Sequence, residues 1–158
     1  MRLLTFIFGV LSSGVAAQDL TYSDYATDAC LQSTRPYQDC VGLSALQCMQ
    51  DTPGGFSTYG ESGCLDAEFQ YWDRLLNVNY KAKMATSKAN DIANEGFGPS
   101  QADALKQMQR AWIPFRDAKC DYERSQWSGG TGGGPATLNC LIHTTAEQAV
   151  LLGESWGD

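Results

Sequence analysis

One stretch of sequence decides the fold: CLDAEFQYWDRLLNVNY, residues 64–80. Its large apolar side chains recur at intervals of three and four residues, which is the spacing of one face of an α-helix. They are Leu65, Phe69, Trp72, Leu76 and Tyr80. The helical pattern extends to about residue 90, so the sequence predicts a helix that is roughly 40 Å long at 1.5 Å per residue.

A second long helix is predicted after the breaker at residues 96–99. Ser100 and Asp103 have the spacing of a capping box, which supplies an oxygen for unpaired amides and an acid near the positive helix end. An apolar stripe follows, and Pro114 inside it predicts a kink or local unwinding. The stripe consists of Leu105, Met108, Trp112, Phe115 and Tyr122.

Two shorter helices complete the prediction. Residues 37–50 form the first, which is weakened by Gly42 and ended by the Pro and Gly residues that open a loop at 53–63. Residues 136–152 form the second, after a glycine-rich loop at 128–135, with Gly153 as its C-cap. Residues 18–35 have no long period and are interpreted as an irregular arm. No strand alternation is present, so the sequence predicts an all-α fold: a small disulfide-stapled bundle with two long antiparallel helices and two shorter ones.

Residues 1–17 have the features of a secretory signal peptide. Arg2 precedes an apolar run over residues 3–11, and Val15 and Ala17 occupy the −3 and −1 positions of a cleavage site. Cleavage after Ala17 removes one charged residue, Arg2, so the formal net charge changes from −7 to −8. We therefore expect a periplasmic or secreted protein. A buried N-terminal helix is the alternative interpretation.

The composition excludes two classes of protein. The chain has 158 residues, of which 11 are basic and 18 are acidic. This negative balance argues against nucleic acid as a partner, because phosphate binding needs a basic surface. No apolar run reaches the roughly 18 residues of a transmembrane helix, so no membrane span is predicted.

Six cysteines lie after residue 17, an even number in a chain that is expected to reach an oxidising compartment. The order of the helices favours three disulfides. They are Cys30–Cys40, Cys48–Cys64 and Cys120–Cys140. Exchange of partners among the first four cysteines remains open. A zinc site is the weaker interpretation, since no C-x-x-C pair exists and His143 is the single histidine.

The most informative motif is QRAWIPFRDAKC, residues 109–120. It is preceded by LNVNY at 76–80 and followed by GGT at 129–131 and by Cys140. This combination resembles the LprI-type lysozyme inhibitor family, whose pattern has an L-N-x-x-Y helix, a W-I-x-(F/Y)-R-D-x-x-C helix and a G-G-(S/T) loop. The resemblance covers residues 48–152. Thr131 stands where Ser is commoner, and residues 143–145 depart from the usual Leu-Thr start of the last helix.

The resemblance implies a disulfide-bonded helical domain of the cell envelope. Some members of the family are similar in activity to inhibitors of lysozyme, and many have no established activity. The motif marks Asn77, Tyr80, Gln109, Trp112, Arg116, Asp117, Gly129 and Gly130. The expected organisation is a signal peptide at 1–17, an arm with the start of the first helix at 18–47, an LprI-like helical domain at 48–153 and a tail at 154–158.

The motif residues also have a structural interpretation. Trp112 lies on the apolar stripe and is expected in the core. Arg116 and Asp117 are adjacent, so they point to different faces of the helix, and each is expected to pair with a neighbouring helix or to cap a loop. Asn77 and Tyr80 are expected to bond the opposite helix.

Catalysis, metals and cofactors are not predicted. Asp66, Glu68 and Asp73 are expected to form a solvated face of the first long helix, and their spacing does not demand the carboxylate pair of a hydrolase. Paired cysteines cannot act as nucleophiles. The glycine loop lacks the lysine of a phosphate-binding P-loop, so it is interpreted as a spacer.

Two functions therefore stand beside each other. The first is an exported protein that inhibits a basic lysozyme by contact, since an acidic surface steers a basic enzyme toward it. The second is an interaction or structural module of the envelope without lysozyme activity, and a hydrolase is the weakest alternative. Loop residues Phe56, Tyr59 and Thr131 are candidate partner contacts, because loops commonly carry function. The sequence leaves the oligomeric state open.

Overall fold

A computed structural model describes residues 19–154, and every regular element in this range is helical. The elements are α1 (Tyr25–Leu31), the 3-10 helix η1 (Tyr37–Cys40), α2 (Leu43–Asp51), α3 (Thr58–Ala93), α4 (Gln101–Ser125) and α5 (Gly133–Gly153). The predicted all-α fold is confirmed. The expected signal peptide lies outside the described residues, as do residues 155–158 of the expected tail.

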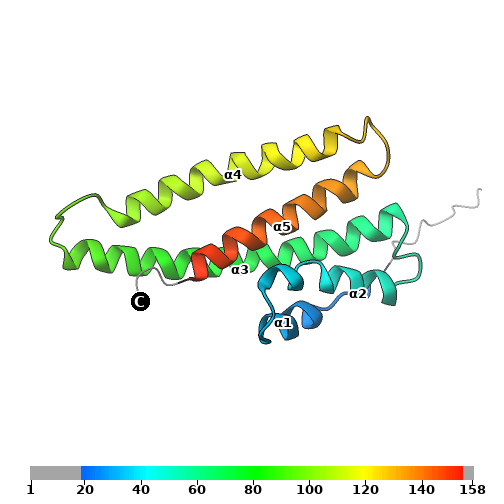
Figure 1. The fold of residues 1–158 in the computed structure, drawn as a ribbon, viewed down its shortest axis with the longest axis horizontal. Helices are drawn as coiled ribbons and strands as arrows, with labels where there is room; N and C mark the ends of the chain where they lie inside the picture. Colours follow the sequence, from blue (N-terminus) through cyan, green and yellow to red (C-terminus); the bar gives the residue numbers. More distant parts are fainter. Residues whose placement is uncertain (1–18, 155–158) are drawn as a thin grey trace, which may run out of the picture.

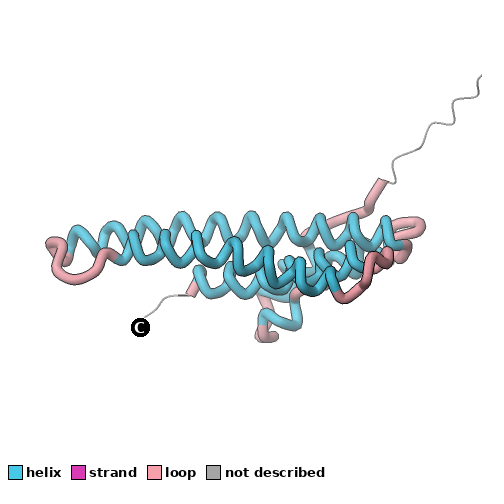
Figure 2. The backbone as a smooth tube through the Cα atoms, turned by 90° about the horizontal axis from the view of Figure 1, so that it is seen from above, coloured by secondary structure: helices cyan, strands magenta, loops and turns pink. Residues whose placement is uncertain are grey.

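Helix α3 is the element on which the others pack (Figure 1). α4 returns antiparallel to it, and α5 then runs back between the two, packing against both. α1 and α2 cover the N-terminal half of α3 on the side away from α4. The loop between α2 and α3 and the loop between α4 and α5 lie at one end of the long helices, and the loop between α3 and α4 lies at the other end (Figure 2).

α3 begins at Thr58, six residues before the predicted start. The side chain of Ser57 accepts a hydrogen bond from the Gly60 amide at 3.1 Å, which caps the helix. Gly60 also packs so closely on the preceding turn that a Cβ at this position would lie 2.5 Å from the carbonyl oxygen of Gly54. Gly60, which the sequence analysis assigned to a loop, therefore allows α3 to start earlier than predicted by packing closely on the preceding turn.

The arm predicted at 18–35 is not irregular throughout, because it contains α1. This helix has only seven residues, too few to show a period in the sequence. Tyr71 on α3 holds it by donating a hydrogen bond from its hydroxyl to Asp28 at 2.6 Å. Burial, and next this bond to Asp28, raise the pKa of the Tyr71 hydroxyl well above its ordinary value.

The helix predicted at 37–50 is divided into η1 and α2 at Gly42. Gly42 has φ +91°, a left-handed conformation that glycine adopts without steric cost, so the chain turns here and α2 starts at Leu43. At the other end of the chain, α5 starts at Gly133, three residues before the predicted start.

The start of α4 is as predicted. The Ser100 hydroxyl accepts a hydrogen bond from the Asp103 amide at 3.1 Å. Asp91, at the end of α3, adds a second cap by accepting from the amides of Gln101 at 2.7 Å and Ala102 at 3.1 Å. The helix continues unbroken through Pro114, so the predicted local unwinding is absent.

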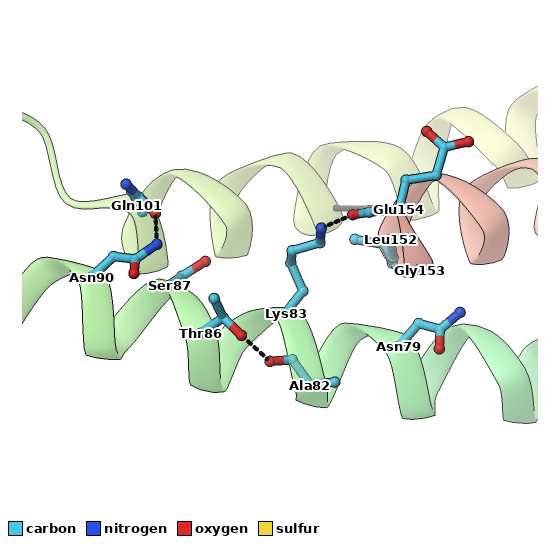
Figure 3. Close-up of a pocket in the computed structure, with 10 residues that line it drawn as sticks. All are labelled: Asn79, Ala82, Lys83, Thr86, Ser87, Asn90, Gln101, Leu152, Gly153 and Glu154. Carbon is cyan, nitrogen blue, oxygen red and sulfur yellow. Dashed lines mark hydrogen bonds between the residues drawn. The ribbon is translucent and has the colours of Figure 1, made fainter. Parts of the chain in front are cut away.

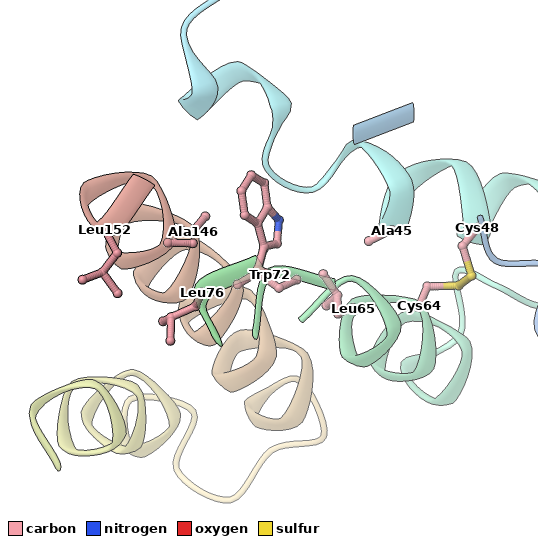
Figure 4. Packing of buried hydrophobic residues seen from close by; sticks show 10 residues of the cluster. Ala45, Cys48, Cys64, Leu65, Trp72, Leu76, Ala146 and Leu152 are labelled. Atoms are coloured by element: carbon pink, nitrogen blue, oxygen red, sulfur yellow. A yellow bond between two sulfur atoms is a disulfide. The ribbon is translucent and has the colours of Figure 1, made fainter. Parts of the chain in front are cut away.

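The core lies where α2, α3 and α5 meet (Figure 4). Trp72 is fully buried at its centre, and the two alanines of α5 in the cluster, Ala146 and Ala149, are small enough to let the helices approach closely. The buried members of the cluster are Ala45, Cys48, Cys64, Leu65, Trp72, Leu76, Ile142, Ala146, Ala149 and Leu152.

The apolar stripe predicted for α4 is wrong as a core face. Phe115 is 61% exposed and Tyr122 is 66% exposed. α4 instead turns Gln109 and Cys120 into the bundle, and only Leu105 and Trp112 of the stripe pack partly buried against the core. The helix is therefore rotated relative to the prediction, because its disulfide and a polar contact orient it.

The three disulfides join Cys30 to Cys40, Cys48 to Cys64 and Cys120 to Cys140. This is the connectivity that the helix order favours, and it excludes exchange among the first four cysteines. Two of the bonds hold the α1–α2 segment to itself and to the start of α3, and the third joins α4 to α5. No cysteine is free.

Candidate functional site

The Arg-Asp pair of the motif forms a contact within α4. The Arg116 guanidinium donates to Asp117 Oδ1 from Nε at 2.9 Å and from Nη2 at 2.8 Å. Its Cζ atom lies 5.1 Å from the centre of the Trp112 ring and 5.7 Å from that of Phe69 on α3. The expected partner on a neighbouring helix or loop is wrong for Asp117, which pairs with the adjacent Arg116 on its own helix. It holds for Arg116, whose guanidinium also lies over Phe69 of α3. The guanidinium stacks between two helices, which fastens α4 to α3.

Gln109 connects α4 to α5. It is buried, and its side-chain oxygen accepts a hydrogen bond from Nε2 of Gln148 at 3.0 Å. Nearer the disulfide, Lys119 of α4 donates to the hydroxyl of Thr144, which lies one turn before Gln148 on α5, at 3.1 Å. These contacts give the motif residues of α4 a role in placing the helix on its neighbours.

Asn77 does not bond the opposite helix. It is exposed and donates to the carbonyl oxygen and to Oδ2 of Asp73 in the preceding turn of α3. Asn79 makes the cross-helix contact instead, by donating to the carbonyl oxygen of Ala149 at 2.8 Å. The sequence indicates this contact, because Asn79 follows the buried Leu76 by three residues and therefore lies on the same face of α3. Tyr80 is half-buried and packs against the core.

Glu68 is the most consequential residue that sequence reasoning misplaced. It is fully buried, whereas Asp66 is exposed and Asp73 is half-exposed, so the predicted solvated face is wrong for this residue. Its carboxylate accepts hydrogen bonds from the amides of Gly42 at 2.6 Å and Ala45 at 2.7 Å. The sequence indicates this burial in one way: Glu68 precedes Trp72 by four residues, so the two side chains share the buried face of α3.

Two further donors complete the environment of Glu68. The indole nitrogen of Trp72 donates to Oε1 at 3.1 Å, and the Thr27 hydroxyl of α1 donates to the same oxygen at 3.3 Å. The carboxylate therefore caps the N-terminus of α2 from α3 and also binds α1, which ties three helices together. Four donors of the protein thus satisfy this buried carboxylate, which fits a structural role.

The candidate partner contacts lie in segments at the same end of the long helices. Phe56 and Tyr59 are 66% and 67% exposed, and Thr131 is exposed as well. Phe56 lies in the loop before α3 and Tyr59 lies in its first turn, while Thr131 lies in the loop between α4 and α5 at the same end (Figure 1). The structure therefore places the segments that carry the three residues, called the tip below, at one end of the long helices, although they are far apart in sequence.

The glycine loop is shaped around Trp127. Gly129 has φ +82°, and the Gly130 amide donates to the Trp127 carbonyl oxygen at 2.7 Å. A Cβ at Gly132 would lie 2.2 Å from the Trp127 ring, so the indole packs directly on this glycine. The turn therefore accounts for Gly129, and the close approach of the Trp127 ring accounts for Gly132.

An open groove of about 420 Å³ lies beside this tip, between α2, the start of α3 and the start of α5. Leu46, Met49 and Leu65 give it apolar walls, and Trp127 and Glu61 also line it. Leu46 and half of the Trp127 side chain are exposed to solvent. The tip and the groove beside it thus expose aromatic and aliphatic surface.

The charge of the segment that carries Phe56 and Tyr59 is one-sided. Residues 36–73, called the acidic region below, contain no lysine or arginine. They contain six acidic residues: Asp39, Asp51, Glu61, Asp66, Glu68 and Asp73. All but Glu68 are at least partly exposed, so this part of the surface carries a negative potential.

A second groove of about 420 Å³ lies between the C-terminal half of α3, the start of α4 and the end of α5 (Figure 3). Several of its polar groups bond one another or the backbone. Asn90 donates to Gln101 at 3.0 Å, Lys83 donates to the Glu154 carbonyl oxygen, and Thr86 donates to the Ala82 carbonyl oxygen. The side-chain amides of Asn90 and Gln101 and the ammonium group of Lys83 thus have hydrogen-bond partners within the protein.

Residues 19–154 include no group of three His, Cys, Asp or Glu side chains that could hold a metal ion. Within the same range, no helix has the length and hydropathy of a membrane span. His143 is exposed on α5, at the edge of an open depression that Lys119 and Glu123 also line.

Comparisons with known proteins identify relatives. The chain is 30% identical over 94 residues to an uncharacterised protein of Rhizobium meliloti, covering 58% of this chain and 68% of the relative. It is 26% identical over 132 residues to an uncharacterised 17.7 kDa protein from the puhA 5′ region of Rhodobacter capsulatus, covering 79% of this chain and 80% of the relative. No solved structure matches the chain at a significant level. The family model described as lysozyme inhibitor LprI matches residues 48–152, two thirds of the chain, and the chain therefore belongs to the LprI lysozyme inhibitor family.

Proposed function

We propose that this protein is an exported inhibitor that binds a basic lysozyme through the tip formed by Phe56, Tyr59 and Thr131. The observation that carries the proposal is the acidic region, in which exposed aromatic side chains stand among acidic groups with no basic residue from 36 to 73. Membership of the LprI family supplies the class of partner. The three disulfides support export, since such bonds persist in oxidising compartments.

Charge and shape have separate roles in this proposal. The acidic residues raise the rate at which a basic enzyme arrives, and the effect weakens as salt screens the charges. Phe56 and Tyr59 supply rigid side chains that bury a large area in contact, and aromatic residues commonly dominate the binding energy of protein interfaces. The groove beside the tip provides room for a protruding side chain of the enzyme.

A lysis assay tests the proposal. The purified oxidised protein is added in excess to several types of lysozyme, and the clearing of cell walls is followed over time. We expect inhibition that weakens as salt concentration rises. The double variant Phe56→Ala/Tyr59→Ala is expected to lose at least about tenfold in affinity, which corresponds to 1.4 kcal/mol.

The chain offers a matched control. Phe97 is 94% exposed in the loop at the opposite end of the long helices, so Phe97→Ala removes an equally accessible aromatic ring away from the tip. It is expected to inhibit like the original protein. Unchanged lysis by every lysozyme type would sink the proposal, and capture of an unrelated envelope protein through Phe56 and Tyr59 would favour the interaction-module alternative.

A further inference from the structure

Six residues of α4 form an exposed stripe, called the α4 seam below. They are spaced alternately by four and three positions and are Ala104, Met108, Ala111, Phe115, Ala118 and Tyr122. All six are exposed, because α4 faces the bundle with Gln109, Trp112, Arg116 and Cys120 instead. The stripe is about 27 Å long at 1.5 Å per residue.

The spacing of the α4 seam is that of the a and d positions of a coiled coil. The sizes of the side chains alternate strictly along it, since every alanine is followed by a large residue and Met108, Phe115 and Tyr122 occupy equivalent positions seven residues apart. Along the α4 seam, a protruding large side chain therefore alternates with the space that an alanine leaves open.

This alternation is complementary to itself in one orientation. If two copies of α4 pair antiparallel, one register places Met108 on Ala118, Phe115 on Ala111 and Tyr122 on Ala104 of the other copy, all at once. Each large side chain then enters the gap over an alanine, which is the arrangement that packs a helix interface densely. Parallel pairing would set large residues on large ones and alanine on alanine.

We propose that a second copy of this chain docks on the α4 seam, with the two α4 helices antiparallel about a two-fold axis. A two-fold dimer uses the same patch twice, so it requires a surface that is complementary to itself. The α4 seam meets this requirement over its full length. The proposal goes beyond the proposed lysozyme binding, because it uses another face of the molecule.

The charges favour a second copy at this face. α4 contains five basic and four acidic residues, whereas the rest of the chain contains six basic and fourteen acidic residues. Two copies of an acidic protein repel each other less where their charges are balanced, and α4 is such a place. The antiparallel orientation also sets the helix dipoles of the two α4 helices in opposition, which is favourable.

Sedimentation of the purified oxidised protein over a range of concentrations tests the pairing. We expect a monomer–dimer equilibrium, and we expect Phe115→Glu to weaken it at least tenfold by placing a charge in the centre of the seam. Ile113→Glu is the matched control: Ile113 is also exposed, but it lies about 200° around the helix from Phe115, so dimerisation is expected to be unchanged.

Cross-linking tests the orientation. Ala104→Cys and Tyr122→Cys are made as separate variants and mixed under mild oxidation, with intact mass confirming the three native disulfides. We expect dimers that join one variant to the other, because positions 104 and 122 of two copies face each other, whereas two copies of position 104 lie about 27 Å apart. Cross-links of Ala104→Cys to itself would overturn the antiparallel arrangement. A monomer at every concentration, or equal dimerisation of Phe115→Glu and the original protein, would overturn the dimer.

Discussion

The acidic region and α4 both expose aromatic side chains, but their charges differ. Residues 36–73 combine Phe56 and Tyr59 with six acidic groups and no basic group, whereas α4 combines Phe115 and Tyr122 with five basic and four acidic groups. Exposed aromatic rings alone do not specify a partner. The charges around the rings differ, and for this reason we propose a basic protein as partner of the first region and a copy of the chain as partner of the second.

The two regions are also held in different ways. The acidic region is fixed by two disulfides and by Glu68, which bonds α1, α2 and α3 from within the core. α4 is held near one end by Cys120–Cys140 and elsewhere by polar contacts, of which Gln109–Gln148 is buried. The fold of the acidic region therefore depends on the buried Glu68 carboxylate, whereas the position of α4 depends on contacts that are spread along its length.

Removal of the Glu68 carboxylate is expected to have the largest effect. Glu68→Ala leaves two amides and the Trp72 indole buried without an acceptor, and unpaired buried donors cost about 1–3 kcal/mol each. Partial relaxation reduces the sum, so we expect a loss of about 3–5 kcal/mol in the free energy of unfolding, measured with urea at intact disulfides. Asp66→Ala, two residues away and exposed, is the control and is expected to change stability by less than about 0.5 kcal/mol. Equal losses for the two variants would mean that Glu68 is not the centre of this region.

Loss of the α4 disulfide is expected to have the second largest effect. Cys120→Ser/Cys140→Ser opens a loop with a sequence separation of 20 residues, for which the chain-entropy model gives about 3 kcal/mol. Hydrogen exchange is expected to increase in the second half of α4 and the first half of α5, while α2 and the start of α3 stay protected. Increased exchange over all helices would show that the two regions unfold as one unit.

The packing of Trp127 on the glycine loop gives a smaller effect at the boundary of the two regions. A Cβ at Gly132 would lie 2.2 Å from the indole, whereas a Cβ at Gly134 has its nearest neighbour at 3.7 Å. Gly132→Ala is therefore expected to displace Trp127, to change its fluorescence and to lower stability by about 1–3 kcal/mol, the usual cost of overpacking. Gly134→Ala is the matched control, and an identical spectrum for both variants would contradict this account of the loop.

The sequence predicted those parts of the fold that depend on local pattern. The period of Leu65, Trp72 and Leu76, the cap at Ser100 and the order of the cysteines are all local, and the structure follows them. α1 escaped prediction because seven residues do not complete enough turns to show a period. Its stability comes from Tyr71 and Glu68, which lie about 40 residues further along the chain.

The errors at the candidate site have one physical cause. Hydropathy assigns charged and polar residues to the surface and aromatic residues to the core, but Glu68 and Gln109 are buried because partners on other helices satisfy their hydrogen bonds. When α4 rotates to bring Gln109 and Cys120 inward, Phe115 and Tyr122 must turn outward. No local pattern in the sequence contains those partners. The prediction therefore placed Glu68 on the surface and the large side chains of the α4 seam in the core.

The smallest predicted effect concerns the far end of α4 and depends on pH. The hydrogen bond from the Ser100 hydroxyl, followed by those from the Gln101 and Ala102 amides, lowers the pKa of the Asp91 carboxyl below its ordinary value of 3.8. A carboxyl with a lowered pKa in the folded protein adds stability that is complete above the ordinary value and is lost as pH falls through the folded value. Asp91→Asn keeps an acceptor but removes the charge. The original protein is therefore expected to be slightly more stable than this variant at neutral pH, and urea unfolding at decreasing pH should show the difference shrinking once the pH passes below 3.8. A difference that stays constant down to the acid limit would show that the charge of Asp91 does not help to hold the start of α4, and that the Ser100 cap and the packing of the helix hold it without that charge.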